Sequence, residues 1–263
     1  MPDKINTLAE KETRVISISI FKGGTGKTTT SISLCASLAN LGRSVLLIDL
    51  DQQASATRHL GIDPDRIQPH LYHVFTKQVP ANLAVHPTNF GFEVMPANSL
   101  LAAIEEAMEP DKDEGMLREA IAGIKSNWDY VIIDSPPGKA MLALNALAAA
   151  GEVIIPLQSE RPALDGAADI LRYIQDIVWD KYNPDLKILG ILPTMMRRTT
   201  SHSTGVIKKA REIWGDKVFV QEIPASIQFP RAFEAGTPLL NLDPDHAGAR
   251  LYLDLAKHID ERR

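Results

Sequence analysis

Cysteine is almost absent from this sequence, and its scarcity excludes several kinds of site. The 263 residues include one cysteine, Cys35, so the chain can build neither a disulfide framework nor a multi-cysteine iron–sulfur or zinc site. Histidine offers little replacement, because the seven histidines are scattered and only His70 and His73 have helical spacing. We therefore predict surface histidines, no metal site made of them, and a protein of the reducing cytoplasm.

Long apolar runs are also missing. No uninterrupted apolar stretch approaches the ~18 residues that suggest a membrane span, and residues 1–13 are too polar for a signal peptide. The hydrophobic fraction is nevertheless 44%, which is enough for one large α/β core in a chain of this length. We expect a flexible N-terminal lead over residues 1–13 and a single domain over residues 14–263.

Positive charge is in slight deficit, since 28 Lys and Arg oppose 33 Asp and Glu. The net charge of −5 and the pI of about 5.8 give no overall attraction to nucleic acid or acidic membranes. Any polyanion must bind at a local patch, and one window contains only Glu212 and Asp216 as acids. Its basic residues are Arg197, Arg198, Lys208, Lys209, Arg211 and Lys217. Two interpretations of this window are open: a solvated helix face, or a patch that contacts DNA phosphates.

One glycine-rich loop contains two lysines. Residues 21–29, Phe-Lys-Gly-Gly-Thr-Gly-Lys-Thr-Thr, follow the apolar run 15–20 and open a helical stretch that ends near Gly42. Binding a phosphate chain needs backbone N–H groups, the positive end of a helix and no side chains in the way. In such a loop Lys27 neutralises the β and γ phosphates and Thr28 ligates Mg²⁺. The loop therefore predicts a nucleotide phosphate site.

Apolar runs and helical periodicities alternate along the rest of the chain. We expect further strands at 44–49, 92–96, 128–134, 153–157, 186–192 and 217–220, and helices at 71–75, 99–108, 141–150, 164–179 and 246–259. Continuous hydrophobicity is typical of parallel strands that are covered on both faces. The pattern predicts an α/β fold with a doubly wound, mainly parallel sheet and helices on both faces.

Carboxylates stand where two of these strands end. Asp49 and Asp51 lie at the end of the 44–49 run, and Asp134 lies at the end of the 128–134 run. The carboxyl ends of parallel strands meet at one edge of the sheet, which is also the edge expected for the glycine-rich loop. Asp134 is placed as the carboxylate that holds Mg²⁺ through a water in P-loop ATPases.

The glycine-rich loop resembles that of a known family. Residues 22–28, Lys-Gly-Gly-Thr-Gly-Lys-Thr, resemble the deviant Walker A box of the ParA/MinD ATPases, in which Lys22 is the additional signature lysine. The 49–57 segment resembles the family's Leu-Ile-Asp-x-Asp box, although Gln52, Ala54 and Ser55 depart from it. Further matches at 95–98, 190–195 and 223–224 extend the resemblance over roughly residues 14–259. It is nearest to the small, Soj-like ParA partition proteins.

The resemblance implies ATP and Mg²⁺ as cofactors and suggests which residues bind them. The phosphates would be bound by Lys22, Gly23, Gly24, Thr25, Gly26, Lys27, Thr28 and Thr29, and the base would lie near Met195, Pro224 and Ser226. Thr28 and Asp134 would surround the magnesium, with Asp49 supporting them. Asp51 would orient the attacking water.

The resemblance also implies how the protein would act. Two ATP-loaded subunits would close face to face, with Lys22 of each reaching the nucleotide of the other. This homodimer would bind double-stranded DNA non-specifically through Arg197, Arg198, Lys208, Lys209 and Arg231. A ParB-like or other cargo-bound protein would stimulate hydrolysis and release the DNA. We thus expect a cytoplasmic, nucleoid-associated ATPase that segregates a plasmid, a chromosome or another cargo.

Two other interpretations are open. An ATP-dependent metabolic ligase that resembles dethiobiotin synthetase could use the same architecture, although it gains no support from the 49–57 segment. A membrane-associated positioning ATPase of the MinD type is the second, but Leu251, Leu255 and Ile259 form a stripe that we expect to pack in the core. Reductase relatives with an iron–sulfur cluster are excluded by the single cysteine.

Overall fold

One sheet lies at the centre of the molecule. The computed structural model describes residues 12–159, 162–197 and 201–263, and its strand order is β3-β4-β2-β5-β1-β6-β7. The strands are β1 (Arg14–Ile18), β2 (Val45–Asp49), β3 (His86–Pro87), β4 (Glu93–Met95), β5 (Tyr130–Asp134), β6 (Glu152–Gln158) and β7 (Lys187–Thr194). All neighbouring strands are parallel except β3 and β4. The predicted doubly wound, mainly parallel sheet is confirmed.

The central strands β2 and β5 are buried along their whole length because helices cover both faces of the sheet. Val15 and Ile16 of β1 pack into the cores on opposite faces, as the alternation of side chains along a strand requires. Each of β2 and β5 ends on a buried aspartate, Asp49 or Asp134, so two carboxylates sit side by side at one sheet edge.

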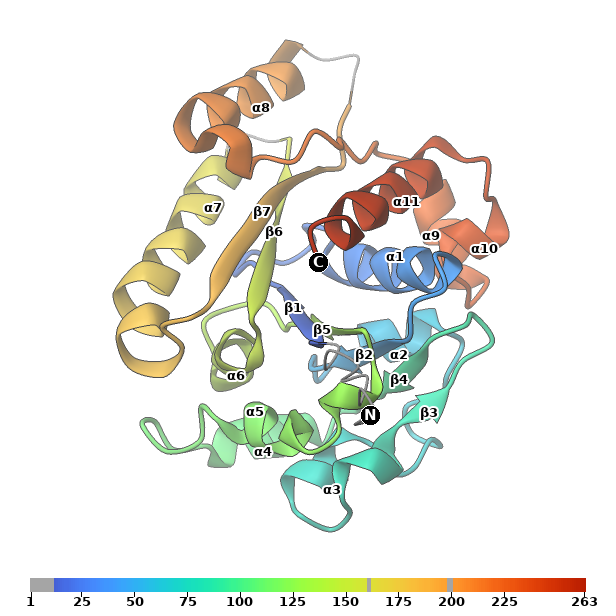
Figure 1. Cartoon of the computed structure of the whole chain (residues 1–263), viewed down its shortest axis with the longest axis vertical. Helices are drawn as coiled ribbons and strands as arrows, with labels where there is room; N and C mark the ends of the chain where they lie inside the picture. Colours follow the sequence, from blue (N-terminus) through green and yellow to red (C-terminus); the bar gives the residue numbers. More distant parts are fainter. Residues whose placement is uncertain (1–11, 160–161, 198–200) are drawn as a thin grey trace, which may run out of the picture.

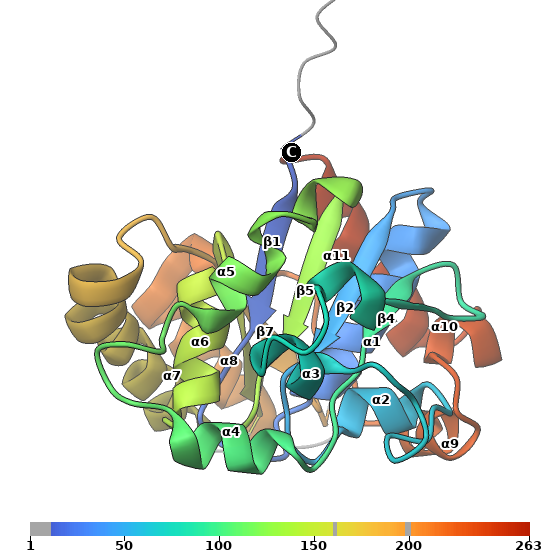
Figure 2. The same ribbon diagram turned by 90° about the horizontal axis from the view of Figure 1, so that it is seen from below.

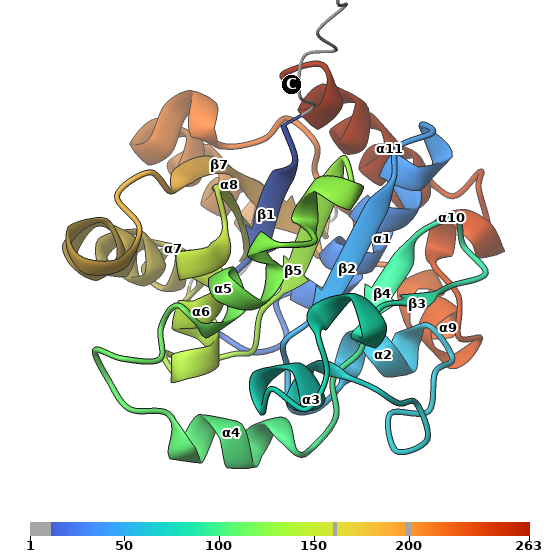
Figure 3. The same ribbon diagram turned by 60° about the horizontal axis from the view of Figure 1, so that its bottom comes forward.

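Helices form a layer on each face. On one face α1 (Lys27–Asn40) lies beside α11 (Ala247–Asp260) (Figure 1). The other face is covered by α3 (Leu71–Phe75), α4 (Leu101–Ala107), α5 (Met116–Ala122), α6 (Met141–Ala149) and α7 (Pro162–Tyr173) (Figure 3). Figure 2 shows α2 (Ser55–His59) and α9 (Gln228–Glu234) near the carboxyl ends of the strands. The remaining helices are α8 (Ser201–Trp214) and α10 (Leu239–Leu242).

Two predictions from the sequence are wrong, and a third is right in extent but not in helix type. The 217–220 segment is not a strand, because Val218 makes a single bridge to Ile191 of β7 and Val220 is 76% exposed. The helix predicted at 164–179 changes at Ile174 into a π-helical segment, Ile174–Tyr182. The histidines are not all on the surface, since His59 and His70 are buried.

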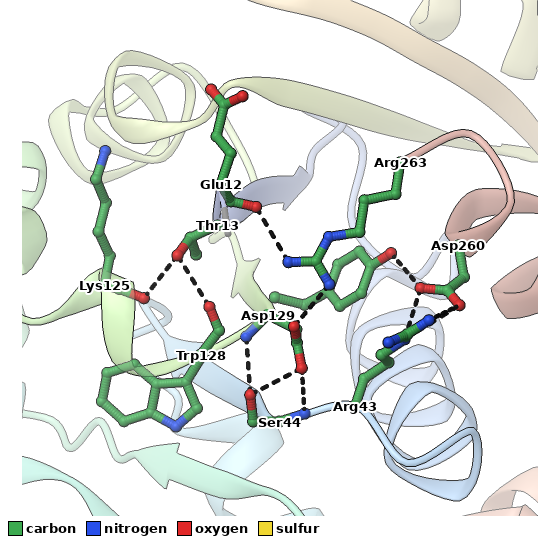
Figure 4. A network of polar contacts seen from close by, with 10 residues as sticks. Glu12, Thr13, Arg43, Ser44, Lys125, Trp128, Asp129, Asp260 and Arg263 are labelled. Carbon is green, nitrogen blue, oxygen red and sulfur yellow. Dashed lines mark hydrogen bonds and ion pairs between the residues drawn. The ribbon is translucent and has the colours of Figure 1, made fainter. Parts of the chain in front are cut away.

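The end of α11 is tied to the amino-terminal edge of the sheet by charged residues (Figure 4). Asp260 forms an ion pair with Arg43 at 2.8 Å and accepts a hydrogen bond from the Tyr130 hydroxyl at 2.9 Å. Arg263 forms an ion pair with the buried carboxylate of Asp129 at 2.6 Å. We call these contacts the C-terminal anchor. It lies at the sheet edge opposite to the aspartates that end β2 and β5.

The apolar stripe of α11 packs in the core, as predicted. Leu255 and Ile259 are fully buried, and Leu251 packs against the same cluster. Within the ranges described above, no helix is long and apolar enough to cross a membrane.

Candidate functional site

The glycine-rich loop leaves the positive end of α1 uncovered. Gly24 and Gly26 have φ of 71° and 88°, a region that other L-residues enter only with strain. Gly26 precedes the first residue of α1, whose amino end has no side-chain cap and no acidic residue in its first turn. The backbone N–H groups at the start of α1 and the positive end of the helix dipole therefore remain available to an anion.

Thr28 and Asp134 meet under this loop. The Thr28 hydroxyl donates to the Asp134 carboxylate at 2.8 Å, and Ser31, one turn further along α1, donates to its other oxygen at 2.8 Å. Burial raises the pKa of Asp134 to about 6, against the hydrogen bonds of both hydroxyls. Ser31 was not among the predicted residues, although its spacing of three from Thr28 places it on the same face of the helix.

These groups suit magnesium only together with a nucleotide. A hydroxyl and a carboxylate are the hard oxygen ligands that Mg²⁺ prefers. Among the described residues, no cluster of three or more His, Cys, Asp or Glu could hold a metal by itself. The ion would need phosphate oxygens and waters as its other ligands, which is how Mg²⁺ is usually bound beside nucleotides.

Lys27 faces inward from the first turn of α1. Its side chain lines a cavity that borders the glycine-rich loop, and the residue is 8% exposed. Burial lowers the pKa of Lys27 from its ordinary value, while the negative charges of Asp134 and Asp51 act in the opposite direction. A lysine that is buried between two carboxylates and an uncapped helix start is suited to neutralising phosphate.

The two aspartates after β2 have different surroundings. Asp49 is fully buried and accepts hydrogen bonds from the backbone and hydroxyl of Thr57 at 2.8 and 2.7 Å. Burial raises the pKa of Asp49 to about 7. Asp51 lines the cavity and accepts from the Gln53 N–H at 2.9 Å. Asp49 therefore fastens the loop that presents Asp51, and its carboxylate is directed at Thr57 rather than into the cavity.

A single cavity of about 940 Å³ joins the loop to the base-side residues. This volume is at the upper end of the range for cofactor sites. Met195, Pro224 and Ser226 all line it, together with residues 23–29. Phe229 and Tyr252 form an aromatic wall of this cavity. No pattern in the sequence predicted this wall, because α9 and α11 are far from the loop in sequence.

Lys22 is placed differently from the other loop residues. It is half-buried and does not line the cavity. Its ammonium group donates to the side-chain oxygen of Gln158 at 3.4 Å.

The predicted DNA-contacting residues do not form one patch on a single subunit. Lys208 and Lys209 lie on α8, where Lys208 is 4.0 Å from Glu212, whereas Arg231 lies on α9, on another side of the molecule (Figures 1 and 2). Arg197 lines the cavity. Arg198 lies outside the described residues.

Comparison with known proteins supports the family resemblance. A family profile described as an AAA domain matches residues 13–188. The chain is 37% identical over 248 residues to sporulation initiation inhibitor protein Soj of Bacillus subtilis, covering 94% of this chain and 98% of that protein. It is 39% identical over 251 residues to chromosome-partitioning ATPase Soj of Thermus thermophilus, covering 95% and 96%.

Solved structures agree with the fold and with the ligands expected. Cobyrinic acid a,c-diamide synthase from Mycobacterium smegmatis, with bound ADP and magnesium, gives a TM-score of 0.83 at 36% identity, covering 94% of each chain. The septum site-determining protein MinD from Pyrococcus horikoshii, complexed with Mg-ADP, gives 0.81 at 25% identity, covering 95% of this chain and 96% of that one. Because the profile spans most of the chain and Soj proteins match nearly all of it, the chain belongs to the ParA/MinD family of P-loop ATPases and is close to its Soj-like partition proteins.

Proposed function

We propose that this protein is a partition ATPase that works as a nucleotide switch. ATP and Mg²⁺ are its cofactors. Residues 23–29 bind the phosphates, and Thr28 and Asp134 hold the ion, which neutralises charge on the β and γ phosphates when bound. The observation that carries the proposal is the 2.8 Å contact between Thr28 and Asp134 beside the uncapped start of α1.

Hydrolysis needs a water that is directed at the γ phosphate. Asp51 is the carboxylate that lines the cavity on the β2 side, and we assign it to orienting that water. Lys27 remains on the subunit's own phosphates. Met195, Pro224 and Ser226, which line the same cavity, would contact the base.

The ATP-bound form is a face-to-face homodimer in which Lys22 reaches the second nucleotide. Its position outside the cavity supports this role, because a lysine that served its own subunit's phosphates would line the cavity, as Lys27 does. Two anionic nucleotides repel each other unless cations lie between them. The dimer therefore depends on the γ phosphate and opens after hydrolysis, which a cargo-bound ParB-like protein stimulates.

DNA binds the dimer through basic residues, although the net charge of the chain is −5. Lys208, Lys209 and Arg231 lie on two separate surfaces of one subunit. A dimer doubles each surface, and affinity for phosphates rises steeply with the number of cations in contact. We propose that Arg197 and Arg198 contribute to the same contact. Binding is therefore expected only in the ATP state.

DNA retention in each nucleotide state tests the proposal. We expect random-sequence duplex DNA to bind in the presence of a slowly hydrolysed ATP analogue and not with ADP, as measured by fluorescence anisotropy. The double variant Lys208→Glu, Lys209→Glu should make the negative slope of log affinity against log salt shallower by about 3 to 4, because four contacts per dimer are lost. The control, Lys181→Glu with Lys187→Glu, should leave that slope unchanged. Binding that ignores salt, or no binding in any nucleotide state, contradicts the DNA assignment.

A second candidate function is an ATP-dependent amide synthase. The observation in its favour is the name of the Mycobacterium smegmatis structure, which is 36% identical to this chain. An amide-forming enzyme consumes ATP only when its carboxylic acid substrate is present. ATP turnover that ignores DNA but rises with cobyrinic acid and an ammonia donor would favour this candidate over partition.

A further inference from the structure

Gln158 connects three parts of the nucleotide site. It is the last residue of β6, in register with Thr194 at the end of β7. Its amide oxygen accepts from the Lys22 ammonium group at 3.4 Å. Its amide nitrogen donates to the Gly24 carbonyl and lies 3.2 Å from the Met195 sulfur. One side chain therefore contacts the start of the loop, its middle and the base side of the cavity.

The partners of Gln158 determine which way its amide faces. An ammonium group can only donate, and a backbone carbonyl can only accept. In the reversed orientation, the amide NH₂ would face the Lys22 ammonium, donor against donor, and the amide oxygen would face the Gly24 carbonyl, acceptor against acceptor. The observed orientation is therefore the one that satisfies both ends. Thr194 supports the same loop by donating to the Thr25 carbonyl at 2.9 Å, which means that the loop keeps a second anchor if Gln158 is changed.

The contact with Gln158 competes with the task proposed for Lys22. A lysine that bonds to its own subunit must leave that partner before it can reach a phosphate of a second subunit. We propose that Gln158 is a positioning residue that holds Lys22 back in the single subunit and releases it to the nucleotide of a second copy of this chain. The inference rests on the proposed homodimer. A neutral amide suits this role, because its hydrogen bond is weaker than an ion pair and exchanges readily for phosphate.

Two substitutions should move dimerisation in opposite directions. Gln158→Glu places an anion beside Lys22, so it should strengthen the hold and raise the dimer dissociation constant about tenfold. Gln158→Met keeps the length of the side chain but removes the acceptor, so it should lower the constant about two- to threefold. Both variants lose the donor to Gly24, and this loss cancels when they are compared. Gln175→Glu, the same change at an exposed residue, is the control and should have no effect.

Sedimentation velocity with a slowly hydrolysed ATP analogue measures the dimer, and calorimetry with ADP reports separately on the shape of the loop. Because Gln158 lines the cavity, a carboxylate there also repels the nucleotide, so the dimer is measured at a saturating concentration of the analogue. The proposal expects the dimer constants of Gln158→Glu and Gln158→Met to differ by more than their ADP affinities do. It also expects added salt to relieve part of the defect of Gln158→Glu, since screening weakens an ion pair that is partly open to solvent.

The outcomes separate this inference from the proposed function. If both variants weaken the dimer equally, or if ADP affinity falls in parallel, Gln158 acts only on the shape of the loop and the inference is wrong. If neither variant changes the dimer while the unaltered protein still forms one with the analogue, the inference is again wrong and the proposed function stands. If the unaltered protein forms no dimer with the analogue, the proposed function itself fails.

Discussion

At the scale of single residues, two lysines of one loop have different surroundings, and these assign them different tasks. Lys27 lines the cavity near two carboxylates, whereas Lys22 rests on Gln158 outside it. Phosphate binding by the isolated subunit should therefore depend on Lys27 and not on Lys22.

Replacing Lys27 tests the phosphate site. Lys27→Ala removes the only charged side chain from residues 23–29, whose other donors are neutral, so ATP affinity should fall about a hundredfold, or ~3 kcal/mol. Isothermal calorimetry with ATP and Mg²⁺ measures the change. Lys187→Ala, at the exposed start of β7, is the control. Near-normal affinity for Lys27→Ala would remove the P-loop assignment.

His59 makes stability depend on pH. It is 5% exposed and lies with its ring edge-on to Phe233 at 5.2 Å. Burial lowers its pKa to about 4, although a hydrogen bond with the Thr237 backbone opposes the shift. The unfolded chain therefore binds more protons than the folded one between about pH 4 and the ordinary value of 6.5. The stability from His59 is fully present above pH 6.5 and is lost as the pH falls toward 4.

A non-titrating variant isolates this effect. Between pH 7 and 4.5 the unaltered protein should lose about 2 to 3 kcal/mol more stability than His59→Gln in urea unfolding. Other titrating groups, including Asp49 and Asp134, are common to both proteins and cancel in the comparison. Parallel pH profiles would show that His59 does not titrate in this range.

At the scale of elements, the C-terminal anchor fixes α11 against β5 and the loop after α1. Arg263 is 19% exposed and its partner Asp129 only 4%, so removing the arginine takes a cation away from a buried carboxylate. The Arg263 guanidinium also lies over the Tyr130 ring, 5.5 Å from its centre, so it contacts an aromatic ring as well as a carboxylate. An ion pair in this position is expected to matter more than one on the surface.

Arg263→Ala should therefore lower the free energy of unfolding by about 1 to 3 kcal/mol. Arg250→Ala, within α11, is the control, because the ion pair of Arg250 with Asp245 is exposed on both sides, and it should cost less than about 0.5 kcal/mol. Urea midpoints measure both. Equal effects of the two substitutions would mean that the anchor adds nothing beyond a surface ion pair.

The sequence predicts well those features that depend on neighbouring residues, such as the strands and the edge of the sheet at which the site lies. Apolar runs located β2 and β5, and the aspartates that follow them meet because parallel strands end at one edge. The prediction of a strand at 217–220 failed because the pairing of a segment with a neighbouring strand is decided by tertiary contacts. The Phe219 ring packs over Gly190, where an added Cβ would lie 2.4 Å from the ring. Only Val218 reaches β7 for a bridge.

Parts of the site could not be predicted because they depend on distant segments. Gln158 ends a strand whose pattern gives no hint of a contact with residue 22, which lies 136 residues away in sequence. The aromatic wall of the cavity comes from α9 and α11, which are placed at the site by packing against α2 and α1 respectively. Phosphate loops are short and local, whereas the groups that surround them are assembled by the fold.

At the scale of the whole molecule, the proposed function depends on a dimer that forms only with a γ phosphate. Each subunit presents its glycine-rich loop and Asp51 at the carboxyl edge of the sheet, with Lys22 outside the cavity. Everything proposed beyond nucleotide binding, including DNA contact and release, follows from the pairing of two such edges. The role of Lys22 is therefore the central claim.

Light scattering of Lys22→Ala with a slowly hydrolysed ATP analogue tests this claim most directly. We expect the variant to bind the analogue with an affinity within about threefold of the unaltered protein yet to remain a monomer, because the cation between the two nucleotides is missing. Lys187→Ala should dimerise normally under the same conditions. A Lys22→Ala protein that dimerises as the unaltered protein does would contradict the account.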